Sequence, residues 1–179
     1  MDIFEAIKKR QSYRGGFTAK PVPREDLKKI VQAGLDAPSG CNAQTTRFVI
    51  VDDAAVVRKI AAMEQARKAV QQAQAFIICI VDETPEGVYE DLSFQVEDCA
   101  AAVENMLLAI TALGYGSVWI DGWLRREGRA EMIGTLLALP AGKRVRILLP
   151  VGVPSETIQQ PAKKPFAERV GFNAYGRGE

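Results

Sequence analysis

The chain of 179 residues contains no histidine. Without an imidazole there is no Ser-His or Cys-His nucleophile pair, no histidine acid or base and no imidazole metal ligand, which excludes much of hydrolase chemistry. An excess of charge of one sign is also lacking, because 23 Lys and Arg face 22 Asp and Glu, a net charge of +1. That balance gives no general drive toward nucleic acid, and we expect no nucleic-acid partner.

Cysteine is scarce and widely spaced. Cys41, Cys79 and Cys99 form no Cys-x-x-Cys pair, which argues against zinc ribbons, thioredoxin motifs and iron–sulfur runs, and we expect no metal site. The number of cysteines is odd, and the first residues are charged and amphipathic, unlike a secretory signal. Both features indicate a reducing compartment. No apolar run approaches the ~20 residues that a membrane-spanning helix needs. We therefore expect a cytoplasmic protein with no membrane partner.

The hydrophobic and charged fractions, 47% and 25%, are typical of one globular domain. Helical and strand patterns alternate along residues 1–152, whereas residues 153–179 are irregular and show little core-forming pattern. We predict a core domain over 1–152 and an extension of the same domain over 153–179. Strands are expected at 47–51, 76–81, 117–120 and 145–151, and helices near 3–7, 23–37, 54–63, 96–113 and 127–137.

Charge is distributed unevenly along the neutral chain. Residues 1–30 carry eight basic and four acidic groups, a net charge of +4, and residues 82–104 carry eight acidic groups and no Lys or Arg. Basic termini could build a phosphate pocket, but solvated helix faces are the more common cause of such a pattern.

Arg10, Ser12 and Arg14 sharpen the phosphate hypothesis. In an extended segment alternate side chains lie on one face, so two guanidinium groups and a hydroxyl would project together. Planar guanidinium groups donate paired hydrogen bonds to a phosphate, and the hydroxyl fills a remaining lone pair. Lys163 and Lys164, near the other end of the chain, could complete the shell. Alone, an Arg-x-Ser-x-Arg segment is more often surface decoration.

Two loops are candidates for binding a ligand, although an ordinary turn explains each one alone. Residues 38–44 (Pro-Ser-Gly-Cys-Asn-Ala-Gln) place small side chains and two amides directly after a helix, which suits hydrogen bonding to the edge of a flat heterocycle. Asp121 and Gly122 end a strand, where a glycine lets the backbone approach a ligand closely. Residues 114–116 (Gly-Tyr-Gly) fail as a dinucleotide fingerprint, because Trp119 stands at the sixth position and a helix precedes them.

Taken together and in this order, these segments resemble the nitroreductase family of FMN-dependent oxidoreductases. The matching pieces cover nearly the whole chain, and the ordered set is specific although each piece is short. They are residues 10–14 with Phe17, 21–23, 37–40 with Asn42, Gln44 and 47–48, Asp98, 114–117 with 119–120, and 163–166 close to Asn173. The resemblance implies an α+β fold, a three-layer α/β/α sandwich with a central mixed sheet covered by helices. It also implies a homodimer in which the C-terminal arm wraps the partner subunit.

The resemblance further implies a cofactor site at the subunit interface. The residues expected to hold the phosphate and ribityl chain of FMN are Arg10, Ser12, Arg14, Lys163 and Lys164. Those expected to reach the isoalloxazine ring from the partner subunit are Pro38, Ser39, Gly40 and Asn42. Asp121 and Gly122 would present backbone near N5 of the flavin.

The chemistry that the resemblance implies has two steps. NAD(P)H would reduce FMN and leave, and a nitroaromatic, a quinone or a similar small acceptor would then be reduced. Because the flavin carries the hydride chemistry, the absence of histidine does not weaken this reading, and no catalytic side chain is named.

Departures from the family pattern concern the substrate more than the flavin. Residues 15–16 (Gly-Gly) replace bulkier residues and are expected to loosen the loop after the phosphate site, and residues 45–46 (Thr-Thr) make the pocket rim more polar. A flavin-binding sensor or carrier without efficient NAD(P)H turnover is therefore the alternative function. Three arginines form either a solvated helix face, the more common arrangement, or a contact for the 2′-phosphate of NADPH: Arg125, Arg126 and Arg129.

Overall fold

The centre of the molecule is one antiparallel sheet of three strands, in the order β1 (Arg47–Val51), β2 (Ala75–Asp82) and β3 (Lys143–Val151). This computed structural model describes residues 1–177. Side chains of the central strand β2 are buried from Ala75 to Val81. They alternate between two separate apolar cores, so that Phe76 and Ile78 belong to one core while Ile77 and Cys79 belong to the other. Both faces of the sheet therefore need a covering layer.

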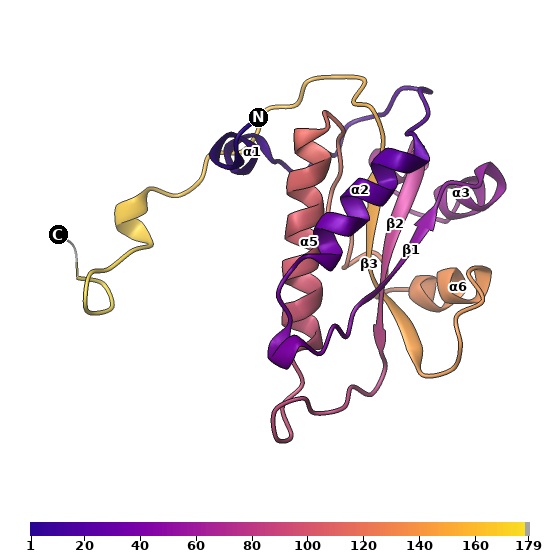
Figure 1. Ribbon diagram of the computed structural model, residues 1–179. Coiled ribbons are helices and arrows are strands. Elements are labelled where there is room, and N and C mark those ends of the chain that lie inside the picture. Colours follow the sequence, from indigo (N-terminus) through magenta and orange to yellow (C-terminus); the bar gives the residue numbers. More distant parts are fainter. Residues whose placement is uncertain (178–179) are drawn as a thin grey trace.

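Helices supply both layers (Figure 1). On one face lie α2 (Arg24–Leu35) and α5 (Gln95–Ala112), which pack side by side and bury Ile30 and Met106 against the sheet. The other face is covered by α3 (Ala54–Ala61), α4 (Lys68–Gln71) and α6 (Arg129–Leu136). The short helix α1 (Ile3–Lys9) lies against α5. The predicted α+β fold with three layers is confirmed.

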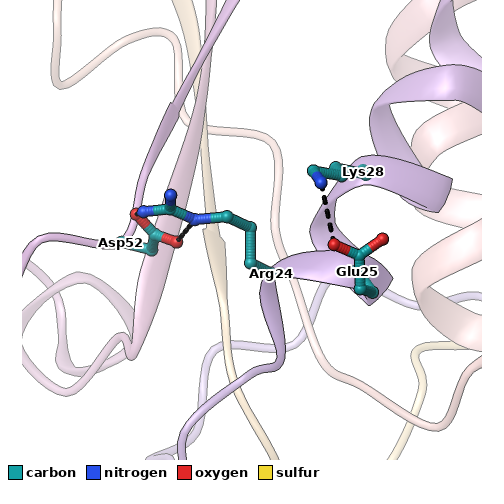
Figure 2. Close-up of polar contacts among 4 residues, drawn as sticks. All are labelled: Arg24, Glu25, Lys28 and Asp52. Atoms are coloured by element: carbon teal, nitrogen blue, oxygen red, sulfur yellow. Dashed lines mark hydrogen bonds and ion pairs between the residues drawn. The ribbon is translucent and has the colours of Figure 1, made fainter.

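The start of α2 is tied to the end of β1. Pro23 precedes the first turn of the helix, and acidic side chains within that turn suit the positive end of its dipole. Arg24 donates from Nε and Nη2 to the two carboxylate oxygens of Asp52, each at 2.6 Å, while Lys28 pairs with Glu25 within the helix (Figure 2). These pairs are largely exposed, so they orient the helix more than they stabilise the fold.

The sheet differs from the sequence-based expectation in two respects. A mixed sheet was expected, but every strand pair formed by residues 1–177 is antiparallel. Residues 117–120 were expected to form a strand, but they only flank β3 through isolated bridges, Gly116 with Gly152 and Ile120 with Leu148. Both bridges share one register, which would pair Val118 with Pro150. Because proline has no backbone N–H, the ladder is interrupted between the bridges.

The paired glycines after Arg14 do not loosen the chain. Gly15 and Gly16 are both buried, and a Cβ at either position would lie 2.8 Å or less from an atom of Tyr13 or Gln72. The backbone of Gly16 is also bonded to the carboxylate of Glu156 and to Ser155. The expectation of a loose loop is wrong, because the two glycines allow this loop to pack closely against the chain at residues 155 and 156.

The C-terminal segment leaves the core after residue 158. Residues 159–177 are all exposed. They contain no helix or strand except one short 3-10 helix (Phe166–Glu168). Figure 1 shows this stretch in yellow, projecting away from the sheet beyond α1. Its exposed large apolar side chains are Phe166, Val170, Phe172 and Tyr175. We refer to residues 159–177 as the arm.

Candidate functional site

A cleft of about 460 Å³ opens at the end of residues 117–120, the segment that flanks β3. Asp121 and Gly122 lie at this point, and we call the cavity the strand-end cleft. A Cβ built on Gly122 would meet no atom within 4 Å, so its backbone faces open space. The residues that line the cleft come from four parts of the chain: Arg14, Gln65, Arg67, Ala69, Val118, Trp119, Ile120, Asp121, Gly122, Trp123, Arg126 and Arg129.

The carboxylate of Asp121 is neutralised by two arginines. Arg125 donates from Nε and Nη2 at 2.6 and 2.9 Å, and Arg146 on β3 donates from Nη1 at 2.7 Å. The hydrogen bonds and the charge of Asp121 raise the pKa of Arg125 above its ordinary value. Asp121 is thus engaged in holding the turn of residues 121–126 against the sheet. It is not placed as a free general base.

Arg10, Ser12 and Arg14 lie in a segment that follows α1 and has no helix or strand, with the intervening Tyr13 buried in the core at 3% exposure. Arg14 lines the strand-end cleft, and within residues 1–177 its guanidinium donates only to the carbonyl of Ser12, at 3.3 Å. The guanidinium of Arg10 instead lies 3.4 Å from the carboxylate of Glu104 on α5. Arg10 and Ser12 do not line the cleft in a single chain.

The loop of residues 38–45 contributes Pro38, Ser39, Gln44 and Thr45 to a second cavity, of about 520 Å³, between α2, α5 and β1. The buried carboxylate of Asp98 organises this loop, because it accepts hydrogen bonds from the backbone N–H of Gly40 at 2.8 Å and from the hydroxyl of Thr45 at 2.9 Å. Pro38 and Ser39 line the cavity, whereas Asn42 is exposed beyond it. A Cβ on Gly40 would lie 2.4 Å from the ring of Phe94, so a close approach requires glycine here.

Lys163 and Lys164 lie on the exposed arm. The start of the arm is linked to the phosphate segment, because the side-chain amide of Gln160 donates to the carbonyl of Arg10 at 3.0 Å. Within residues 1–177 neither lysine forms an ion pair.

The predicted site residues therefore fall into separate groups. The fold brings Arg14, Asp121 and Gly122 to the strand-end cleft, and it brings Pro38 and Ser39 to a cavity that shares no lining residue with that cleft. Arg67 also lines the cleft, but no sequence pattern pointed to it. It precedes α4, a helix of four residues that is too short to give a periodic signal. Trp123, which directly follows the predicted pair Asp121 and Gly122, also lines the cleft.

Comparison with known proteins bears directly on this arrangement. The sequence model of the nitroreductase family matches residues 7–86 and 66–153. The chain belongs to the nitroreductase family. A curated relative from Methanothermobacter thermautotrophicus is 33% identical over 156 residues, which is 87% of this chain and 79% of that protein. The NADPH-flavin oxidoreductase of Vibrio harveyi is 29% identical over 183 residues, with 97% of this chain and 75% of that protein covered.

A solved structure of a nitroreductase family relative from Desulfovibrio desulfuricans, in complex with FMN, superposes with a TM-score of 0.79. It is 29% identical to this chain, and the match covers 98% of both chains. No helix within residues 1–177 combines the length and the apolar character needed to cross a membrane.

The residues of the strand-end cleft fit the cofactor of a nitroreductase family member. FMN carries a phosphate, a polar ribityl chain and a flat ring, which require cations, polar donors and an apolar wall respectively. The cleft offers the guanidinium of Arg14, which has no carboxylate partner within residues 1–177, together with Trp123 and open space over Gly122. Unpaired guanidinium groups around a concave site attract an anionic ligand.

Proposed function

We propose that this nitroreductase family member takes hydride from NAD(P)H and reduces a small acceptor, such as a nitroaromatic or a quinone, by a ping-pong mechanism. Family membership makes it an FMN-dependent oxidoreductase, with NAD(P)H as the co-substrate. The observation that supports this proposal most is the strand-end cleft, where unpaired arginines surround the exposed backbone of Gly122.

In this proposal the polypeptide binds and orients, and FMN supplies the hydride chemistry when it is bound. Arg10, Ser12 and Arg14 hold the phosphate and ribityl chain, and the two arm lysines, Lys163 and Lys164, close on the phosphate. Asp121 and Gly122 present backbone to the ring. Because both oxygens of Asp121 accept from arginines, its carboxylate fixes the position of that backbone and does not move a proton.

The site is completed by a second copy of the chain. Pro38, Ser39, Gly40 and Asn42 would reach the flavin from the partner subunit, which is consistent with their absence from the lining of the strand-end cleft in a single chain. The extension over 153–179 would pack on the partner as part of the same domain. The surfaces available for this contact are apolar and exposed in a single chain, namely Ile3, Phe4 and Ile7 on α1 and the aromatic side chains of the arm.

A reducing location such as the cytoplasm suits the cysteines of this protein. Cys41 is a free, exposed thiol, and Cys79 and Cys99 are buried in the core. The contact with Cys99, together with burial, raises the pKa of the Cys79 thiol, so it is protonated and unreactive.

Anaerobic mixing of the FMN-loaded protein with NADH or NADPH tests the proposal. We expect the visible flavin absorbance to be lost with at least one nicotinamide and to return when a benzoquinone or a nitroaromatic is added. Bound flavin that neither nicotinamide reduces would contradict the proposal and favour the alternative, a flavin-binding sensor or carrier without efficient turnover.

A further inference from the structure

The strand-end cleft has an excess of positive charge beyond what one phosphate of FMN requires. Three arginines that line it, Arg14, Arg67 and Arg126, form no ion pair within residues 1–177. The one carboxylate among the lining residues, that of Asp121, already accepts hydrogen bonds from Arg125 and Arg146. Cations in a concave, partly apolar site raise the local concentration of anions. This excess therefore concerns a second anionic ligand as well as the flavin.

The fold separates the three arginines of residues 125–129, which the sequence alone leaves equivalent. Arg125 is held by both oxygens of Asp121. Arg129 is 3% exposed, donates to the carbonyls of Trp123 and Arg126, pairs with Glu127, and lies over the Trp123 ring at 5.0 Å. Both guanidinium groups are therefore committed to holding the turn.

Arg126 is different. It lines the cleft with an exposed side chain, and it forms no ion pair within residues 1–177. Its backbone is nevertheless fixed, because its carbonyl accepts a hydrogen bond from the buried Arg129 at 3.3 Å. A free guanidinium on an anchored backbone suits recognition of an oxyanion.

Arg67 adds a second unpaired guanidinium from a different element. It precedes the first turn of α4 and lines the same cleft. Trp123 lines the same cleft, and its indole N–H donates to the carbonyl of Glu64 at 3.2 Å, which fixes the ring. The combination of a fixed aromatic wall and two free cations suits a flat molecule that carries an anionic substituent.

We propose that Arg126, supported by Arg67, is a specificity-determining residue that binds an oxyanion on the reactant that exchanges electrons with the flavin. The oxyanion is either the 2′-phosphate of NADPH or a carboxylate on the acceptor. This inference rests on the proposed function for its biological meaning, but the binding that it predicts can be measured without turnover.

The test measures dissociation constants by calorimetry on the full-length protein loaded with FMN. One comparison, for the phosphate, is between adenosine 2′,5′-bisphosphate and adenosine 5′-monophosphate. The other, for the carboxylate, is between 4-nitrobenzoate and 4-nitrobenzamide. In Arg126→Gln we expect the preference for the more anionic ligand to fall about tenfold or more in one of the two comparisons, because a hydrogen bond to a charged group is lost. Arg126→Lys should retain part of the preference. The comparison that responds identifies the source of the oxyanion.

Arg58→Gln is the matched control, since Arg58 is exposed on α3 and lines neither the strand-end cleft nor the second cavity. It should keep both preferences. Unchanged preferences in Arg126→Gln overturn the proposal, and so does a tenfold or greater loss of FMN affinity in that variant, because Arg126 would then belong to the flavin site. Failure of the proposed function is seen separately, as absence of nicotinamide oxidation by the parent protein.

Discussion

The two arginines of the predicted phosphate segment, Arg10 and Arg14, are engaged to different degrees, and this affects how readily each can bind a phosphate. Arg10 has Glu104 within 3.4 Å, whereas Arg14 has only the carbonyl of Ser12. An arginine that is already paired must share or give up its carboxylate to bind another anion. We therefore expect Arg14 to contribute at least as much to flavin binding as Arg10.

Arg14→Ala should weaken FMN binding roughly ten- to a hundredfold, since a hydrogen bond to a charged group contributes ~1.5–3 kcal/mol. Titration of the apoprotein with FMN, followed by flavin fluorescence, measures this. Arg58→Ala, which removes an exposed arginine on α3, is the control and should bind as the parent does. Parental affinity in Arg14→Ala would remove this residue from the flavin site.

Two glycines of the predicted site have opposite surroundings. Gly40→Ala should lower the free energy of unfolding by about 1–3 kcal/mol, because its Cβ would overlap Phe94 in a packed contact. Gly122→Ala meets no neighbour and should change stability by less than about 0.5 kcal/mol. Urea unfolding of the two variants measures both values. Equal stabilities would show that the loop of residues 38–45 does not pack on Phe94.

At the scale of elements, one partly buried hydrogen bond links α2 to the segment that follows α5. The hydroxyl of Tyr115 donates to the carboxylate of Asp26 at 2.8 Å. This hydrogen bond and a second from Lys29 lower the pKa of Asp26. Burial and the same carboxylate raise the pKa of Tyr115 to about 12, so the hydroxyl remains a donor throughout the ordinary pH range.

The Asp26 link makes stability depend on pH in a defined direction. A carboxyl whose pKa is lower in the folded state stabilises the protein fully above its unfolded pKa, near 4, and loses this contribution as the pH falls through the folded pKa. In Tyr115→Phe the acid-side loss should be smaller, because the folded pKa of Asp26 moves back toward its ordinary value. Unfolding free energies measured from about pH 2 to pH 6 test this.

Tyr89→Phe provides the control for this pH dependence, since Tyr89 lies exposed in the loop before α5. Its pH profile should match that of the parent. A Tyr115→Phe profile that also matches would mean that the hydroxyl does not set the charge of Asp26.

Apolar periodicity predicted most elements correctly, because burial alone determines them. It located β1, β2, β3, α2 and α5 to within a few residues, and the unbroken apolar run of β2 correctly predicted cover on both faces. The prediction of a strand at 117–120 was wrong because strand pairing also depends on the partner strand β3, where Pro150 interrupts the hydrogen-bond ladder. Such a defect is visible only once the register of the two segments is known.

The candidate site could be predicted only in part. Arg14, Asp121 and Gly122 do lie at one cleft, although they are far apart in sequence. Residues 38–42 do not line this cleft, and Lys163 and Lys164 are exposed. In the proposed dimer these positions depend on a second chain, which no local pattern encodes. The unequal roles of Arg125, Arg126 and Arg129 depend on tertiary partners such as Asp121.

At the scale of the whole molecule, the exposed apolar surface is concentrated on α1 and the arm. Phe4 is 79% exposed and Phe166 67% exposed, and the rings of Phe166 and Phe172 lie 6.4 Å apart. Exposed aromatic clusters of this kind mark interaction surfaces. A second copy of the chain would cover both regions and bring its own loop of residues 38–42.

Replacing Phe166 and Phe172 together by serine should therefore weaken the dimer and lower FMN affinity at least about tenfold. Each aromatic side chain that the partner buries would contribute ~1.5–3 kcal/mol to the dimer. Sedimentation at several protein concentrations measures the dimer, and flavin titration measures the affinity. Met132→Ser, an exposed change on α6, should alter neither. A dimer that persists with full flavin affinity would show that the arm does not bind the partner.

The most direct test of the central claim is size-exclusion chromatography of the purified protein after incubation with FMN, with light scattering and visible absorbance recorded on the same peak. We predict the mass of two chains and one FMN per chain, bound at the strand-end cleft. A colourless peak with the mass of one chain would contradict this account of the protein.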